Sequence, residues 1–192
     1  MIKNIIQNDF KPPRLKDQAI DTLAVMEEYK IEDIPVVDDN NKLLGIITES
    51  SIINMNDLQE SLHFIKSQLK PVSIVSDMHI FQGIKLFHKY KSSIIPVTNK
   101  NDIYMGYIKP FDVISQMCLG LKNDNKNSIL IISTNHKDYT LHEISRLVEE
   151  NSGKISFLWS EEINDKIKLH LMINCMNSQM IIQALERYDY DI

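Results

Sequence analysis

Glycine is scarce in this chain of 192 residues, and its five glycines are widely spaced. No two of them lie close enough to form a G-x-G-x-x-G turn or a Walker-type phosphate loop. Both motifs need glycines at short fixed spacings, because the backbone must approach phosphate groups closely. Their absence excludes a dinucleotide-binding Rossmann fold and a P-loop NTPase.

Cysteine, basic charge and long apolar runs are also limited. The two cysteines form no C-x-x-C pair and no disulfide framework, which is typical of a reducing compartment. The net charge of −5 gives no electrostatic reason to expect a nucleic-acid partner. The longest purely apolar run, 129–132, is far shorter than the ~20 residues of a membrane helix, and the N-terminus is unlike a signal peptide. We therefore expect a soluble, cytoplasmic protein.

An internal repeat organises the first two thirds of the chain. When the sequence is shifted by 61 positions, it matches itself without a gap. The Ile-Pro-Val segment at 34–37 falls on 95–98, and the glycine-led segment at 45–48 falls on 106–109. Two copies of a half-domain that bury their faces against each other explain this pattern.

Each copy is predicted to fold as α-β-β-α. A helix is expected after a capping aspartate, Asp17 or Asp77, followed by a buried strand, a turn rich in Asp and Asn, a second strand and a second helix. The strands are predicted at 34–37 and 43–47 and at 94–97 and 104–108, and the second helices at 50–55 and 111–119. Apolar residues at helical spacing predict a connecting amphipathic helix over 57–69.

The segment after the repeats has a different order. A strand over 128–133 is followed by a helix that opens at the capping box of Thr140, two strands with alternating apolar residues, and a final helix near 178–188. The order β-α-β-β-α is the ferredoxin-like pattern without its last strand. It predicts that the natural protein continues beyond Ile192. A polar linker over 121–127 separates the two parts.

The paired Ile-Pro-Val and Gly-x-x-Thr segments, repeated at constant offset, resemble a tandem pair of CBS domains, which are regulatory domains of the cystathionine β-synthase type. The last part resembles an ACT domain, a small ligand-binding or dimerising module. Together they resemble the acetoin-utilisation type of bacterial CBS protein. The resemblance implies an α+β fold with CBS repeats at 1–60 and 61–120 and an ACT-like domain at 128–192.

The resemblance also implies two clefts, each able to bind an adenosine derivative such as AMP, ADP, ATP or S-adenosylmethionine. Apolar side chains near the Ile-Pro-Val strand would hold the adenine. A hydroxyl at the end of the Gly-x-x-Thr segment would contact a phosphate. An aspartate three positions later would bind the ribose hydroxyls through charge-assisted hydrogen bonds. The segments 11–13 and 72–74 would line the clefts.

Neither copy carries the complete set of binding residues. The first keeps Thr48 but has Ser51 at the aspartate position, and a serine cannot hold a ribose diol with two acceptors. The second keeps Asp112 but has Lys109 at the hydroxyl position, which can attract a phosphate as a point charge. We therefore expect the Asp112 cleft to be the more competent. The predicted walls are Ile95, Pro96 and Val97 in that cleft and Ile34, Pro35 and Val36 in the Thr48 cleft.

Each polar candidate also has an ordinary structural explanation. Asp112 could cap the helix that follows it, and the Thr48 hydroxyl could bond to backbone at the end of its strand. Lys109 could simply be solvated. The two roles of Asp112 can coexist.

Catalysis and metal binding have little support in the sequence. No G-x-S-x-G segment occurs, and the six histidines have no metal-ligand spacing. We expect a non-enzymatic sensor that needs no cofactor, binds an adenine nucleotide and acts through dimer or partner contacts. The alternative is a ligand-free scaffold with degenerate clefts, favoured by Ser51, Lys109 and the lack of glycine in the ACT-like loop 135–140. An apolar strand face around Trp159 would need to be covered, which favours a homodimer. The expected regulated protein is a further partner that the sequence does not identify.

Overall fold

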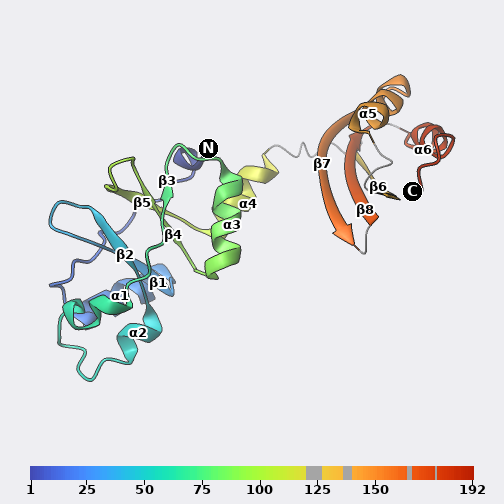
Figure 1. Ribbon diagram of the computed structural model, residues 1–192. Helices are drawn as coiled ribbons and strands as arrows, with labels where there is room; N and C mark the ends of the chain where they lie inside the picture. The colour runs from blue at the N-terminus through green and yellow to red at the C-terminus, as the bar shows by residue number, and fades with distance from the viewer. Residues whose placement is uncertain (120–126, 136–139, 164–165, 176) are drawn as a thin grey trace. The chain divides into compact units, whose positions relative to one another are not determined.

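The computed structural model describes residues 1–119, 127–135, 140–163, 166–175 and 177–192. The chain divides into two compact units, Met1–Met117 (unit 1) and Cys118–Ile192 (unit 2), shown in Figure 1. Each unit combines helices with mainly antiparallel sheets, so the predicted α+β class is confirmed. No helix in the described part of the chain is long and apolar enough to cross a membrane.

The first copy of the repeat folds as predicted in its main elements. It contains helix α1 (Ala19–Tyr29), strands β1 (Asp33–Val37) and β2 (Leu43–Thr48), and the short helix α2 (Glu49–Ile53). The two strands pair antiparallel. All five residues of β1 are buried: the acidic Asp33 and the apolar residues that follow it.

The second copy repeats this order. It contains helix α3 (Ile80–Tyr90), strands β4 (Ile95–Thr98) and β5 (Tyr104–Ile108), and helix α4 (Pro110–Cys118). A two-residue strand, β3 (Ile74–Val75), adds in parallel to β4. The short helix η1 (Ile2–Asn4) lies at the start of the chain, and its Ile2 is fully buried in the core of this copy.

The contacts between the two copies come in pairs that differ by 61 residues. The amide of Leu43 donates to the carbonyl of Asp102 at 2.9 Å, and the amide of Tyr104 donates to the carbonyl of Asn41 at 2.9 Å. The two hairpin turns therefore meet across a local twofold axis. This relation confirms the pseudo-twofold repeat.

The connecting amphipathic helix was predicted wrongly. Only Leu62–Gln68 is helical, as the 3-10 segment η2 with a break at Ile65. The preceding carbonyls of Leu58 and Glu60 accept the first amides of α1, at 2.9 and 3.0 Å. Because these carbonyls serve the free N-terminal amides of another helix, the segment before Leu62 lies alongside α1 instead of coiling on itself.

The predicted aspartate caps were also wrong. Asp17 accepts a hydrogen bond from the Arg14 amide at 2.8 Å, and Gln18 is the N-cap of α1. At α3 the N-cap is His79, whose Nδ1 accepts from the Phe81 amide at 3.3 Å. The two helices begin one and two residues later than the sequence suggested, which leaves the aspartates in the preceding turns.

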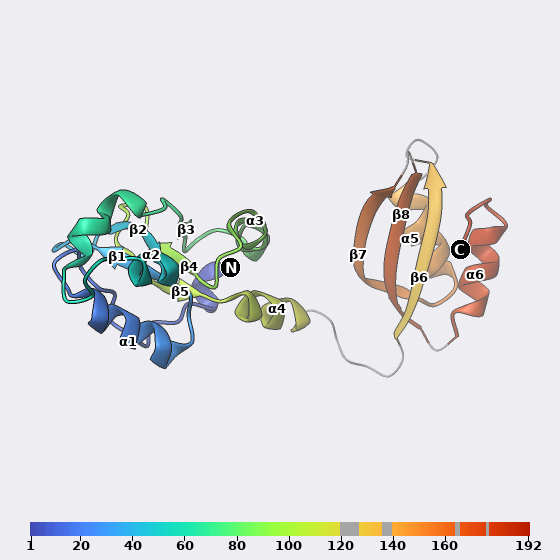
Figure 2. The ribbon, with the colours of Figure 1, turned by 90° about the horizontal axis from the view of Figure 1, so that it is seen from below.

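Unit 2 has the predicted order of elements. Strand β6 (Asn127–Asn135) and helix α5 (Leu141–Glu150) are followed by β7 (Lys154–Ile163), β8 (Lys166–Asn174) and α6 (Gln179–Glu186). Strand β8 lies between β6 and β7 in an antiparallel sheet (Figure 2). The Thr140 hydroxyl accepts from the Glu143 amide, which confirms the predicted cap.

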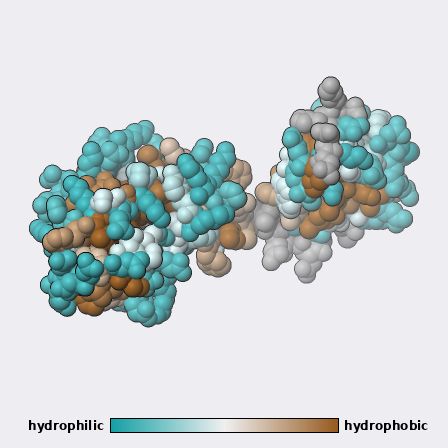
Figure 3. Space-filling view, turned by 60° about the horizontal axis from the view of Figure 1, so that its bottom comes forward, coloured by the Kyte–Doolittle hydropathy of each residue, from teal (hydrophilic) through white to brown (hydrophobic). Residues whose placement is uncertain are grey.

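The two faces of the unit 2 sheet differ. Alternate residues of β6 and β8 pack with α5 and α6 in one apolar core. The opposite face leaves Ile129, Ile131 and Trp159 at 65, 45 and 50% exposure. Figure 3 shows hydrophobic side chains gathered on the surface of this unit. Asp191 forms an isolated antiparallel bridge with Ser133, at the edge of β6 away from β8.

The predicted linker 121–127 lies outside the described residues except for Asn127, which begins β6. The loop 135–140 is described only at Asn135 and Thr140.

Candidate functional site

The apolar walls predicted for both clefts lie inside unit 1. Six side chains share this burial: Ile34, Pro35, Val36, Ile95, Pro96 and Val97. The four aliphatic ones are fully buried and belong to the two core clusters of the unit. In this arrangement they hold the sheets and helices together, and a ligand would reach them only after the packing opened. Their contact with adenine therefore stays a prediction.

Asp112 lies in the first turn of α4, where both of its carboxylate oxygens have partners. Oδ2 accepts from the backbone amide of Lys109 at 2.7 Å, and Oδ1 accepts from Nε2 of Gln7 at 2.8 Å. Because α4 begins at Pro110, Asp112 is its third residue and not its N-cap, and its carboxylate reaches back to the residue before the helix, as in one half of a capping box. The simple N-cap explanation was thus wrong in detail, although a stabilising role at the helix end is real.

Lys109 lies directly before the same helix. Its Nζ donates to the backbone carbonyl of Tyr29 at 3.2 Å, near the C-terminus of α1, where a cation is favourable. The same Nζ lies 5.8 Å from the centre of the Tyr107 ring. The structure therefore brings Asp112 and Lys109 together and adds two tyrosines beside them.

The N-terminal segment lies beside these tyrosines. The sequence predicted that residues 11–13 would line the cleft, but the contacts come from Asp9 and Phe10, which it missed. The Phe10 ring lies 5.0 Å from the ring of Tyr107 and 5.2 Å from that of Tyr29. The Tyr107 hydroxyl donates to Oδ1 of Asp9 at 2.7 Å, and the Tyr29 hydroxyl donates to the Asp9 carbonyl at 2.8 Å. Burial, together with the bond to Asp9, raises the pKa of Tyr107 well above its usual value.

Tyr104 lies close to this cluster and is buried, with only 5% exposure. Its hydroxyl has no hydrogen-bond partner among the residues that the structure describes. Burial raises the pKa of this hydroxyl, and the carboxylate of Asp9 raises it further. The side chain borders a hollow of about 440 Å³, which is also lined by Asn8, Asp9, Phe10, Lys11, Pro12 and Asn41. A buried hydroxyl without a partner is unusual and costly in a folded protein.

The Thr48 cleft has a different character. Thr48 is the N-cap of α2, and its Oγ1 accepts from the Ser51 amide at 3.2 Å and shares a hydrogen bond with the Ser51 hydroxyl at 2.8 Å. The structural explanation of Thr48 therefore holds. A hollow of about 230 Å³ lies beside it, lined by Glu32, Asp33, Thr48, Glu49, Ser50, Lys70, Tyr90 and Lys91.

The charges around this second hollow are mixed. Lys70 and Lys91 supply positive charge next to the Thr48 hydroxyl, whereas Glu32 and Glu49 oppose an anion. Tyr90 and Lys91 were missed as site residues, although the repeat itself pointed to them. They fall on Tyr29 and Lys30 at the shift of 61 residues, so both clefts have a tyrosine at the end of a helix.

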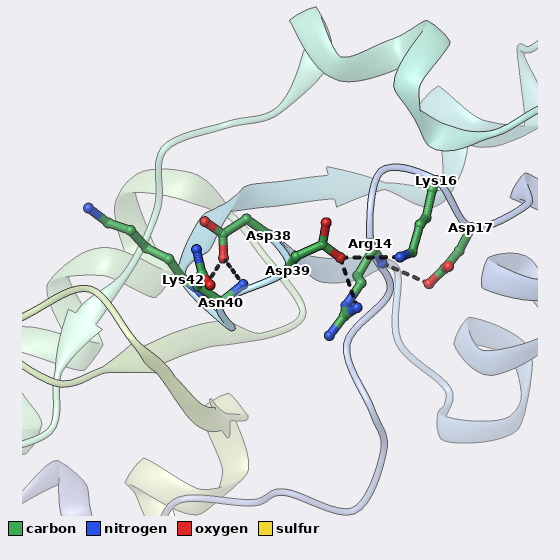
Figure 4. Close-up of polar contacts among 7 residues, drawn as sticks. All are labelled: Arg14, Lys16, Asp17, Asp38, Asp39, Asn40 and Lys42. Atoms are coloured by element: carbon green, nitrogen blue, oxygen red, sulfur yellow. Dashed lines mark hydrogen bonds and ion pairs between the residues drawn. The ribbon is translucent and has the colours of Figure 1, made fainter.

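A third hollow, of about 370 Å³, lies beside β1. Figure 4 shows Arg14 and Lys16 directed at Asp39, with Nη1 and Nζ at 2.8 and 3.2 Å from the same oxygen. The hydrogen bond and charge of Lys16, with the charge of Arg14, lower the pKa of the exposed Asp39 carboxyl. Asp38 accepts from the amides of Asn40 and Lys42, which fixes the hairpin turn. These charged groups neutralise one another, and the described residues contain no cluster of three or more metal-binding side chains.

Comparison with known proteins shows which of them this chain resembles. Residues 16–56 match the family model of the CBS domain. Inosine-5'-monophosphate dehydrogenase from Helicobacter pylori strain 26695 is 27% identical over 93 residues, which are 48% of this chain and 19% of that protein. Homoserine O-acetyltransferase from Methanococcus vannielii is 25% identical over 123 residues, 62% of this chain and 25% of that protein. The chain thus spans only a fifth to a quarter of the length of these relatives.

Solved structures resemble the chain in fold. A CBS domain pair/ACT domain protein from Thermotoga maritima has a TM-score of 0.56 at 16% identity, covering 62% of this chain and 98% of that one. A Vibrio cholerae protein described as an acetoin utilization protein has a TM-score of 0.52 at 20% identity, with 63% and 92% covered. CBSX2 in complex with AMP has a TM-score of 0.52 at 17% identity, with 64% and 98% covered. The predicted resemblance to CBS-pair proteins is confirmed at the level of the fold.

Proposed function

We propose that this chain, which has the fold of CBS-pair proteins, is a non-enzymatic regulatory protein that binds an adenosine-type nucleotide between its two repeats. It works in the cytoplasm as a homodimer, and the bound nucleotide changes its contacts with a second subunit or a regulated protein. A ligand drives such a change only through different affinities for two arrangements of the protein. One solved structure of this fold carries AMP, which is a precedent for the ligand class.

The observation that carries the proposal is the composition of the Asp112 cleft. A carboxylate able to accept two ribose hydroxyls lies in the same cleft as the ammonium group of Lys109 and the rings of Tyr29 and Tyr107. A carboxylate binds a diol with two charge-assisted bonds, an ammonium group attracts a phosphate, and aromatic rings stack on a base. Because these groups match the ribose, the phosphate and the base, together they suit a whole nucleotide better than a free sugar, phosphate or base.

The Thr48 cleft supports the same class of ligand less strongly. Lys70 and Lys91 could attract a phosphate toward the Thr48 hydroxyl. The position of the ribose-binding aspartate holds Ser51, whose hydroxyl is already paired with Thr48. We therefore rank this cleft second.

Calorimetric titration of nucleotide-free protein with AMP, ADP, ATP and S-adenosylmethionine tests the proposal. The variant Asp112→Asn keeps the side-chain shape and removes the charge, and we expect it to weaken nucleotide binding by about tenfold or more. The matched control is Asp102→Asn, because Asp102 is an exposed carboxylate in the turn between β4 and β5. Equal affinity in both variants would reject the site assignment.

A second function is favoured by a specific observation. Both oxygens of Asp112 already accept hydrogen bonds from this chain, and Phe10 fills the space between the tyrosines. A cleft that is satisfied by its own protein suits a ligand-free scaffold. The protein must first be shown to be free of nucleotide, by the lack of excess absorbance at 260 nm. If none of the four ligands then gives a heat of binding, the scaffold function is the better description.

A further inference from the structure

We propose that segment 7–10 is an intramolecular plug that closes the Asp112 cleft, and that a nucleotide binds there by displacing it. The inference rests on the proposed function and adds the regulation of that same site. Three features of the segment support the plug: a competing hydrogen bond, a competing ring and an insertion found in only one of the two repeats.

The hydrogen bond from Gln7 competes directly with a ribose. Its Nε2 lies 2.8 Å from Oδ1 of Asp112, while Oδ2 is held by the Lys109 amide at 2.7 Å. A ribose diol needs both oxygens of one carboxylate for its two hydroxyl donors. Each carboxylate oxygen has two acceptor positions, so Oδ2 can keep the Lys109 amide, whereas the Gln7 amide group competes with the diol for Oδ1 and has to move aside.

The Phe10 ring competes with a base. Phe10 is 7% exposed and contacts both tyrosine rings of the cleft, at 5.0 and 5.2 Å between ring centres. It is fixed there by its neighbour Asp9, which accepts from the hydroxyls of Tyr29 and Tyr107. An aromatic ring in this position fills the space that a stacked adenine would require.

The pseudo-twofold relation shows why only one cleft is closed. The N-terminal segment and segment 70–75 occupy equivalent places in the two repeats. Gln7 forms a bridge with Tyr107, and the equivalent bridge joins Lys70 to Ile46. Arg14 forms a bridge with Val37, and the equivalent pair is Val75 and Thr98. Six residues, 8–13, join these points in the first repeat, whereas four residues, 71–74, join them in the second. The two additional residues give the N-terminal segment the length to turn Phe10 inward.

The closed arrangement leaves one polar group unsatisfied. The Tyr104 hydroxyl is buried beside Asp9 and Phe10 and has no hydrogen-bond partner within the described chain. Such a group is costly when it is buried. A ligand that displaces the plug and offers an acceptor, or admits water, relieves this cost and so favours opening.

The first experiment measures AMP binding to the whole chain and to Gln7→Ala. We expect the variant to bind AMP about fivefold more tightly, because one hydrogen bond to the cleft no longer has to be broken. Gln82→Ala is the matched control, since Gln82 is an exposed glutamine on α3. A second variant, Phe10→Ala, should also bind more tightly, provided circular dichroism shows that it is folded.

The second experiment follows the plug itself. Hydrogen exchange of the peptide that covers residues 5–10 should become faster when the wild-type chain is saturated with AMP. Slower or unchanged exchange, together with unchanged affinity in Gln7→Ala, would overturn the plug and leave the proposed function intact. If AMP, ADP, ATP and S-adenosylmethionine all fail to bind to wild type, Gln7→Ala and Phe10→Ala, the proposed function is overturned, and the plug with it. Binding by the variants alone would establish the plug.

Discussion

At the scale of single residues, the two repeats are joined by one buried carboxylate that breaks their symmetry. Asp33 is 6% exposed, and its Oδ2 accepts from the hydroxyls of Ser92 and Ser93 at 2.7 and 3.1 Å and from the Ser93 amide at 2.7 Å. The equivalent position in the second repeat is Ile94. A buried carboxylate is stable only when its hydrogen bonds are made, so this cluster fixes the packing of the first repeat on the second.

Replacing this carboxylate tests its contribution. Asp33→Ala leaves the Ser93 hydroxyl and amide without their acceptor, while the Ser92 hydroxyl keeps the Ile94 carbonyl, and we expect a loss of about 3 kcal/mol in the free energy of unfolding. The comparison is Asp39→Ala, because the Asp39 side chain is 73% exposed and solvent screens its ion pairs, so the loss in the free energy of unfolding should be much smaller. Urea unfolding followed by circular dichroism measures both. Equal losses would mean that Asp33 is no more important than a surface carboxylate.

A buried phenol gives unit 2 a dependence on alkaline pH. Burial, with the hydrogen bond from the Tyr190 hydroxyl to Glu143, raises the pKa of Tyr190 to about 12. The usual value is about 10, so the neutral form stabilises the folded state. This stabilisation is complete below pH 10 and is lost as the pH rises through 12.

The variant Tyr190→Phe should lose this dependence. We expect the wild-type midpoint of urea unfolding to fall more steeply between pH 10 and 12 than that of the variant, with Trp159, the single tryptophan, reporting on unit 2. Tyr188→Phe is the control, because Tyr188 is 47% exposed. Parallel curves for wild type and Tyr190→Phe would contradict the assignment.

At the scale of elements, the N-terminal segment depends on one glycine of β5. Gly106 has a φ of +140°, and a Cβ added there would meet the backbone oxygen of Gln7 and lie 2.5 Å from the Ile6 side chain. Only glycine allows this backbone conformation and this close approach without strain. The pairing of Gln7 with Tyr107, and therefore the position of the proposed plug, follows from that glycine.

A substitution at this position should separate the segment from the strand. We expect Gly106→Ala to lower the free energy of unfolding by about 3 kcal/mol. Gly83→Ala in α3 should change it by no more than about 1 kcal/mol, because the nearest atoms lie at 3.4 Å and alanine favours the helix. Chemical denaturation of the two variants decides the point. If Gly83→Ala lowers the free energy of unfolding as much as Gly106→Ala does, the close approach of the N-terminal segment to β5 is not the cause of the loss.

The connecting segment shows how a correct pattern can predict the wrong element. Leu58, Leu62, Ile65 and Leu69 do face the core, as their spacing indicated. Their backbone is nevertheless not an α-helix, because the carbonyls of Leu58 and Glu60 accept the first amides of α1. Periodicity identifies the side chains that are buried, but it does not show which distant amides need an acceptor.

At the scale of the whole molecule, the open face of the unit 2 sheet remains to be explained. Ile129, Ile131 and Trp159 are about half exposed or more, and the Trp159 ring stacks on His170 at 4.3 Å. Exposed apolar patches of this kind often mark interfaces. Our prediction of a homodimer therefore assigns this face to the second copy.

Sedimentation velocity tests that assignment. We expect wild type to sediment as a dimer and Ile129→Lys to sediment as a monomer of 22.3 kDa, because a charge would be buried at the interface. The control is Ile53→Lys, which changes an isoleucine of 57% exposure in unit 1. Dissociation by Ile53→Lys alone would move the interface to unit 1, and a monomeric wild type would remove the dimer from the proposed function.

The sequence by itself determined the repeat and the main order of helices and strands in both parts, and it pointed to Asp112, Lys109 and Thr48 as candidate site residues. These follow from periodicity and spacing, which are local properties of the chain. Only the tertiary structure decided what surrounds those residues. It put the Ile-Pro-Val strands into the core, brought Gln7 to Asp112 across 105 residues, and set Phe10 between Tyr29 and Tyr107. Such contacts join segments far apart in the chain, and no local pattern records which of two similar clefts a distant segment will fill.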